Sequence, residues 1–144
     1  MIKKAVILMI LSFAGCSLDD LSPIHVTGRY YVVERDYVDK NSKLSFELES
    51  GTYIGIVKPT VFAAGFNDSF IFAKRHPMEL FESHPRMDIT EWYIVKRNRD
   101  SNGNDLEPVD TFGPYSEQHF YTKLSKLGVQ RDSVAFTIVK ESVK

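Results

Sequence analysis

The sequence predicts an α+β domain: a mainly antiparallel β-sheet of about six to seven strands, with one helix from the C-terminal half packed on it. Short segments rich in β-branched and aromatic residues recur from residue 28 onward and are separated by turn residues. Residues 116–127 form the one segment with a helical repeat between clear capping residues. Because the strand segments are joined by short connections, we expect neighbouring strands to be antiparallel. The helix then covers one face of the sheet.

Seven segments have strand character. In residues 43–49, KLSFELE, apolar and polar residues alternate strictly, which is typical of a half-buried strand. Residues 53–58 are apolar on both faces, so we expect this strand to be central in the sheet. Gly65 indicates a bulge in the strand at 61–66. The other predicted strands are residues 30–33, 70–74, 91–97 and 134–139.

The predicted helix at residues 116–127 has a signal at each end. Ser116 is a favourable N-cap, and Gly128 follows the last turn, where a left-handed residue commonly ends a helix. The apolar residues between them fall on one stripe, which is the face we expect to lie on the sheet. A single helical turn is also expected at residues 78–83, between two His-Pro pairs.

Residues 1–15 have the order of a secretion signal: two lysines, a ten-residue run that is apolar except for one serine, and small residues before Cys16. A helix that spans a membrane needs about 20 apolar residues, so this run is too short to be one. We expect residues 16–27 to be a polar tether and residues 28–144 to be a single β-rich domain.

The stretch Phe13-Ala14-Gly15-Cys16 resembles the lipobox of bacterial lipoproteins, although leucine is usual at the position of Phe13. The resemblance implies that Cys16 is the lipidation site, that it carries fatty acyl chains such as palmitate, and that the signal is cut before it. Two or three acyl chains on one residue hold a protein on a membrane. The expected location is the cell envelope, and the outer membrane in a Gram-negative host, because Ser17 follows the cysteine. The alternative is an ordinary secretion signal with a chance cysteine.

The composition argues against some partners and some chemistry. Without residues 1–15 the net side-chain charge changes from −1 to −3, so there is no basic excess and we expect no nucleic-acid partner. Cys16 is the only cysteine, so its acylation leaves none for a disulfide or a nucleophile. The domain therefore depends on burial, and its ten Phe, seven Tyr and one Trp supply much of the apolar area.

Three stretches occur in the order FIFAKRHP at residues 70–77, WYIV at 92–95 and FGPYSEQHF at 112–120. Together they resemble a family of small bacterial lipoproteins that carry a domain of unknown function. The resemblance covers about residues 50–128. It implies a location and a fold, and it implies no activity.

His76 and His84 are the best candidates for metal ligands, with Glu79 and Glu82 between them. Zinc binds three or four converging ligands, and imidazole with carboxylate groups would serve. Two turn histidines that precede prolines explain the same pattern. We expect no cofactor and no catalytic residue, because the sequence has no motif of a hydrolase or of a phosphate-binding loop.

Residues 98–103, NRDSNG, resemble the opening of a calcium loop. The twelfth position of such a loop would be Val109, where a bidentate glutamate is required. A hairpin loop rich in turn-forming residues is the better interpretation.

Two basic pairs, Lys74-Arg75 and Lys96-Arg97, each end a predicted strand, and Arg99 follows the second pair. If the two strands pair so that these ends meet, they form a site for an anion such as a lipid headgroup. The alternative is that the strand ends are solvated.

Aromatic side chains on the strands either line a ligand groove or fill the core. A sheet of this size needs apolar side chains of this volume, so core filling is favoured. The residues concerned are Tyr53, Phe62, Phe66, Phe70, Phe72, Trp92 and Tyr93.

Two functional hypotheses follow. The first is a non-catalytic binding or structural module of the cell envelope, anchored to the membrane through Cys16, with an unknown envelope protein or ligand as its partner. A narrower form of it is an inhibitor of an envelope enzyme such as a lysozyme, although such inhibitors usually carry a disulfide. The second is a metal-dependent envelope hydrolase that uses His76 and His84.

Overall fold

A computed structural model describes residues 23–34 and 42–139 of the protein. The expected signal peptide, Cys16 and the first part of the expected tether lie outside these residues. The strands are β1 (Ile24–Thr27), β2 (Tyr30–Glu34), β3 (Ser42–Glu49), β4 (Thr52–Val57), β5 (Val61–Phe66), β6 (Phe70–Arg75), β7 (Glu91–Lys96), β8 (Asn98–Arg99), β9 (Asp105–Leu106), β10 (Thr111–Tyr115) and β11 (Thr137–Ile138). One α-helix, α1 (Glu117–Lys126), and a short 3-10 helix (Arg131–Ser133) follow β10.

The strands form two sheets and a separate small hairpin. Sheet A has the order β1-β2-β3-β4, sheet B has the order β10-β7-β6-β5-β11, and β8 pairs with β9 alone. Every pair of neighbouring strands is antiparallel, as the short connections predicted. The predicted α+β class is confirmed, and the strands are divided between two sheets.

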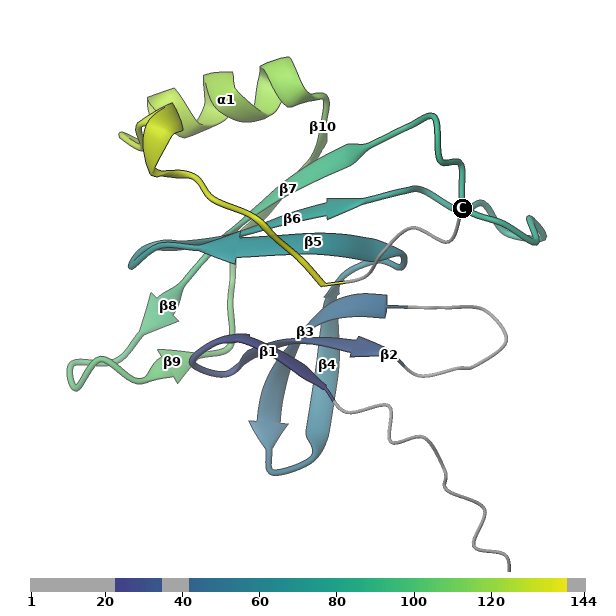
Figure 1. Cartoon of the computed structure of the whole chain (residues 1–144). Coiled ribbons are helices and arrows are strands. Elements are labelled where there is room, and N and C mark those ends of the chain that lie inside the picture. The colour runs from purple at the N-terminus through teal and green to yellow at the C-terminus, as the bar shows by residue number, and fades with distance from the viewer. Residues whose placement is uncertain (1–22, 35–41, 140–144) are drawn as a thin grey trace, which may run out of the picture.

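The molecule has three layers, with sheet B between α1 and sheet A (Figure 1). Alternation along β6 and β7 produces this arrangement, because successive side chains point to opposite faces of a sheet. Ile71 and Tyr93 face sheet A, whereas Phe72 and Ile94 face α1. The core between the sheets contains Tyr30, Val32, Leu44, Phe46, Val57, Val61, Ala64, Ile71, Ala73, Tyr93 and Val95. The core under the helix contains Phe70, Phe72, Trp92, Ile94, Phe120 and Leu124.

The prediction that residues 53–58 form a central strand was wrong, because β4 lies at the edge of sheet A. Its apolar residues serve two surfaces. Ile54 and Ile56 pack on the core between the sheets, while the ring of Tyr53 contacts Tyr31 on the outer face. The central strands with two buried faces are β6 and β7.

The prediction of a bulge at Gly65 was also wrong. The register of β5 and β6 shifts between Val61 and Ala63, whereas Gly65 pairs regularly with Phe72. A Cβ atom at Gly65 would lie 1.9 Å from the carbonyl oxygen of Ala135. The glycine therefore permits the close approach of the C-terminal segment that leads into β11.

Three other segments differ from the predictions. The expected helical turn at residues 78–83 is a tight turn, in which the Glu82 amide donates to the Glu79 carbonyl at 3.1 Å. Ile24–Thr27, expected to be tether, pairs with β2 as an edge strand. The last predicted strand, residues 134–139, is reduced to the two residues of β11.

The predicted helix is confirmed, including its ends. The Ser116 hydroxyl accepts a hydrogen bond from the His119 amide at 3.3 Å, and Gly128 has a φ of +76° just after the last turn. Phe120 and Leu124 are fully buried against sheet B. No helix within the described residues has the length and apolar character needed to cross a membrane.

Candidate functional site

The two sheets differ in what covers their outer faces. Helix α1 lies on the outer face of sheet B, whereas in the described part of the chain no helix lies on the outer face of sheet A (Figure 1). The polar residues of β2, β3 and β4 that alternate with core residues point to this face. Side chains from these three strands therefore come together on this face.

The pairing of three strands fixes the positions of the side chains on this face. Ser45 lies at the centre, with Tyr31 beside it on β2 and Gly55 beside it on β4. Lys43 lies before Ser45 on β3 and pairs with Val33, while Glu47 lies after it and pairs with Tyr53. Tyr31 and Tyr53 therefore lie diagonally across β3, and Ser45 between them is too small to separate their rings.

Three rings form a row across the sheet. The ring centroids of Tyr31 and Tyr53 are 5.3 Å apart in an edge-to-face arrangement, and those of His25 and Tyr31 are 5.0 Å apart. The His25 Nε2 atom lies 2.9 Å from the Gly28 carbonyl oxygen, which fixes the ring at one end of the row. The row presents aromatic surface outside both cores.

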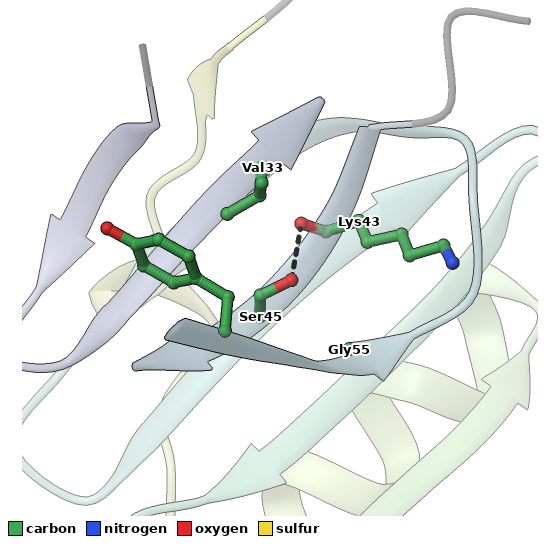
Figure 2. A pocket seen from close by; sticks show the side chains of 5 residues that line it. Val33, Lys43, Ser45 and Gly55 are labelled. Carbon is green, nitrogen blue, oxygen red and sulfur yellow. Dashed lines mark hydrogen bonds between the residues drawn. The ribbon is translucent and has the colours of Figure 1, made fainter. Parts of the chain in front are cut away.

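A hollow of about 50 Å³ adjoins the row and is lined by Val33, Lys43, Ser45, Tyr53 and Gly55. Figure 2 shows Val33, Lys43, Ser45 and Gly55 around it, each placed by a strand of sheet A. The hollow exists because Gly55 has no side chain and Ser45 has a short one. The Ser45 hydroxyl donates to the Lys43 carbonyl at 3.3 Å. The space suits a small substituent of a ligand and not a whole ligand.

Charged groups flank the rings and the hollow. Lys43 and Glu47 occupy the two positions on β3 either side of Ser45, and both are partly exposed. Burial and the neighbouring Glu47 carboxylate raise the pKa of Tyr53 above its ordinary value. The face therefore offers aromatic surface, a cation, an anion and hydroxyl groups on rigid strands. Such a surface can bind a ligand by stacking and by hydrogen bonds.

Two wider hollows lie beside the loop that follows α1. One, of about 430 Å³, lies between residues 67–70 and 127–133, and the other, of about 570 Å³, lies between α1 and residues 128–132. Residues 127–133 form much of the wall of both, and their hydrogen bonds are local turns such as Ser133 N to Gln130 O at 3.1 Å. Three hydrogen-bonded strands hold the side chains on sheet A more firmly, so sheet A is the better candidate.

The metal candidates have other partners. The ring of His76 stacks on Phe62 at 4.3 Å, and its Nδ1 atom lies 2.8 Å from the Ile89 carbonyl oxygen. The Nδ1 atom of His84 lies 2.8 Å from the Ser83 hydroxyl. Among the residues that the structure describes, no group of three His, Cys, Asp or Glu side chains is placed to hold a metal ion. The hydrolase hypothesis therefore has no metal centre there.

The predicted hairpin loop at residues 98–103 is confirmed, with β8 and β9 as the arms of the hairpin. Asp100 organises the turn, because its carboxylate accepts from the amides of Asn102 and Asn104 at 2.8 and 2.9 Å. Hydrogen bonds from Asn104 are the main reason that the pKa of Asp100 is below its ordinary value. The carboxylate is used within the loop, and this arrangement accounts for the resemblance to a calcium loop.

The anion-site prediction was wrong about geometry. Because β6 and β7 are antiparallel, Arg75 pairs with Glu91 at one end of the sheet, while Lys96 pairs with Phe70 at the other. The two basic pairs are thus separated by the length of the strands. The two basic pairs would meet only if β6 and β7 were parallel.

Both arginines of these pairs are bound in ion pairs. Arg75 contacts the Glu91 carboxylate at 2.6 Å, and Arg97 contacts the Asp105 carboxylate at 2.9 Å. The Asp105 pair is almost fully buried, and Arg99 contacts the same carboxylate at 3.4 Å. Burial raises the pKa of Asp105, but the hydrogen bonds and charge of Arg97 outweigh burial and hold the pKa below its ordinary value.

Lys74 has an environment that the sequence did not suggest. Its Nζ atom lies 4.1 Å from the centre of the Trp92 ring and 4.2 Å from that of Phe136. Burial lowers the pKa of Lys74, against the opposing charge of Glu117. The lysine joins sheet B to the C-terminal segment through cation–π contacts.

Of the aromatic residues considered for a groove, most fill the cores. Phe70, Phe72, Trp92 and Tyr93 are buried, whereas Phe66 is 50% exposed. The prediction of core filling is confirmed for those four residues. The functional candidates that sequence reasoning missed are His25 and Tyr31. The alternation Tyr30-Tyr31-Val32 was the available signal. Tyr30 and Val32 point into the core, so Tyr31 points to the opposite face of β2.

Residues 27–140 match the family described as "Protein of unknown function (DUF3997)". The chain belongs to this family. The match covers nearly all of the described domain and extends beyond the residues 50–128 on which the resemblance was based. Neither the curated proteins nor the solved structures yielded a match. The match therefore covers the strands β2 to β11 and α1.

Proposed function

We propose that this protein is a lipid-anchored, non-catalytic binding module of the cell envelope, attached to the membrane through acyl chains on Cys16. Its binding surface is the outer face of sheet A. Its ligand has ring-shaped units with polar groups at their edges, as the sugar units of an envelope glycan have. The proposal describes binding and holding, not chemical conversion.

One observation carries the proposal. Sheet A presents a row of three rings beside a small hollow, on a face that α1 does not cover. Tyrosine and histidine rings contact flat apolar surfaces, and their polar atoms bond to hydroxyl groups. The neighbouring Lys43 and Glu47 offer a donor and an acceptor at the edges. Strand pairing fixes all of these groups before a ligand arrives, which lowers the entropic cost of binding.

The anchor is tested by the Cys16→Ser variant of the full-length chain in its host. We expect the parent to partition with membranes and to incorporate labelled palmitate. The variant should keep its signal peptide or enter the soluble fraction, and it should not be labelled. A variant that is processed and partitions like the parent would refute the anchor.

The binding surface is tested by titrating soluble glycan fragments of the cell wall into the chain that begins at residue 16, with Cys16→Ser. All core residues lie between Val26 and Val139, so this chain contains the whole folded unit. We expect NMR shifts at Tyr31, Ser45 and Gly55. Tyr53→Ala should weaken binding about three- to tenfold, which corresponds to the loss of one ring contact.

Phe66→Ala is the matched control, because Phe66 is a partly exposed aromatic residue on sheet B. It should bind like the parent. Shifts that spread over sheet B, or equal losses in both variants, would remove the surface from consideration. Titrating the same glycan fragments into an unrelated soluble protein of similar size and charge measures nonspecific glycan binding.

A further inference from the structure

The loop between β6 and β7, residues 76–90, carries two consecutive, highly exposed large apolar side chains at its tip. Leu80 is 82% exposed and Phe81 is 96% exposed, and Met87 in the same loop is 47% exposed. Consecutive apolar side chains of this size rarely stand fully in water without a function. Because they are so exposed, both side chains are free to insert into another medium.

The base of this loop is firmly held. The His76 ring stacks on Phe62, the His76 Nδ1 atom lies 2.8 Å from the Ile89 carbonyl oxygen, and the Arg86 amide donates to Pro77 O at 2.8 Å. The Thr60 hydroxyl donates to the carbonyl of His76. The tip is thus presented from a fixed base.

The turn at the tip has an unusual backbone. Phe81 has a φ of 75°, a left-handed conformation that is costly for a bulky residue. The turn is closed by Glu79 and Glu82, since the Glu79 amide donates to the Glu82 carboxylate at 2.9 Å. This conformation points an aromatic ring into solvent between two acidic residues, where the fold itself gains nothing from it.

Strand register places this loop at the same end of the molecule as the start of β1. In sheet A, Ile24 pairs with Val32, and Val32 with Leu44. The Ser42 hydroxyl, two residues before Leu44, donates to Val61 O at 2.5 Å, which connects this end of sheet A to sheet B. Val61 pairs with Arg75, the last residue before the loop.

The proposed anchor brings this end to the bilayer. The chain from Cys16 to Ile24 has eight residue steps and spans at most about 29 Å when fully extended. Acylated Cys16 therefore keeps the Ile24 end of the domain within a short distance of the membrane. The exposed tip extends from the same end of the two sheets.

We infer that Leu80 and Phe81 insert into the lipid surface as a second membrane contact and orient the anchored domain. The inference rests on the proposed anchor at Cys16. Glu79 and Glu82 flank the tip, so the contact favours zwitterionic over anionic lipid. This orientation turns the opposite end of the domain, with the hairpin β8–β9, away from the membrane.

The test couples the chain that begins at residue 16 to a maleimide lipid through Cys16, its only cysteine, in phosphatidylcholine vesicles. Phe81→Trp and Val109→Trp each add one tryptophan to the buried Trp92. Val109 is 82% exposed and matches Leu80. It lies at the other end of sheet B, where Lys96 N donates to Asp110 O at 3.0 Å.

With brominated lipid in the vesicles, we expect the tryptophan at position 81 to be quenched and the one at position 109 to keep its emission. Adding Leu80→Ser to the Phe81→Trp chain should shift the equilibrium toward the withdrawn tip by about tenfold. Phosphatidylglycerol should reduce the quenching at position 81, because of the two glutamates. Equal quenching at both positions would overturn the inference and leave the tip as a contact for a partner protein.

The chemical coupling separates the two proposals. If Cys16 is not acylated in the cell, the Cys16→Ser experiment shows it, while the vesicle result is unaffected. If the tip does not enter lipid, the vesicle experiment shows it, while the anchor remains supported.

Discussion

Sheets A and B are built from similar strands but are buried to different extents. Sheet B has one core on each side, so β6 is buried at five of its six positions. Sheet A has a core on one side, and its other side carries Tyr31, Ser45 and Tyr53. The difference separates the roles: side chains on sheet B determine stability, whereas the outer face of sheet A can change with little effect on folding.

The two sheets are joined at one end by a buried ion pair. Asp105 accepts hydrogen bonds from Arg97, which follows β7 of sheet B, at 2.9 and 3.1 Å. A Cβ atom on Gly28, in the β1–β2 turn of sheet A, would lie 1.8 Å from the Asp105 carboxylate. The carboxylate therefore sits against both sheets.

The largest expected effect is in sheet B. Phe72 is fully buried between β6 and α1 and contacts the Phe120 ring at a centroid distance of 6.0 Å. Phe72→Ala should lower the free energy of unfolding by about 4 kcal/mol, because it removes apolar contact and leaves a cavity. Urea denaturation measures this loss. A loss below about 1 kcal/mol would mean that sheet B is not the stabilising layer.

Asp105→Asn should cost about 3 kcal/mol at neutral pH, because it leaves the buried Arg97 without its counter-charge. The lowered pKa of Asp105 in the folded state contributes stability above the unfolded pKa of about 3.9. This contribution disappears as the pH falls through the folded pKa. Parent and variant should therefore differ by a constant amount above about pH 5 and converge in acid.

Asp68→Asn is the control for this charge, since Asp68 is exposed in the β5–β6 turn. It should change stability by less than about 0.5 kcal/mol at every pH. Denaturation curves at a series of pH values test both variants. If the free energies of unfolding of the parent and Asp105→Asn fell in parallel in acid and did not converge, the role given to the ion pair would be contradicted.

Two glycines allow a matched comparison of the sheets. A Cβ at Gly65 in sheet B would meet Ala135 O at 1.9 Å, whereas a Cβ at Gly55 in sheet A would meet only Lys43 Cδ, at 3.3 Å. Gly65→Ala should cost about 2 kcal/mol, because the C-terminal segment must move. Gly55→Ala should be nearly neutral in thermal melts, because the lysine side chain can shift. Equal costs would show that the contact with Ala135 is not restrictive.

The smallest effect on stability is expected on the outer face of sheet A. Tyr31→Ala and Tyr53→Ala each remove one cross-strand ring contact, so each should cost less than about 1 kcal/mol. Chemical denaturation checks the values. A loss as large as that of Phe72→Ala would identify the ring row as a structural element, and the binding proposal would lose its basis.

Local patterns predicted the elements better than their arrangement. Alternation predicted β3 within one residue, the composition of residues 70–74 predicted β6 within one residue, and the caps at Ser116 and Gly128 predicted α1 closely, because these features depend on neighbours in sequence. The position of β4 at an edge was not predictable in this way. Apolar residues on both faces occur in central strands and also in an edge strand with Tyr53 on its outer face.

The candidate site depended on register, which the sequence did not reveal. Tyr31 and Tyr53 are 22 residues apart and become neighbours only through pairing of both β2 and β4 with β3. The hypothesis that the basic ends of β6 and β7 meet also depended on how the strands pair, and antiparallel pairing separates these ends. Cys16 differs from these cases, because its interpretation rests on adjacent residues alone.

The order of strands along the chain has a consequence for synthesis. Sheet A consists of the first four strands in succession and is complete at Val57, whereas its apolar partners on β6 and β7 emerge later. While the chain is being synthesised, there is therefore a stage at which Tyr30, Leu44 and Phe46 have been made but their apolar partners on β6 and β7 have not. At this stage these side chains are exposed. Chaperones that recognise exposed apolar segments have a binding site on the chain at this stage.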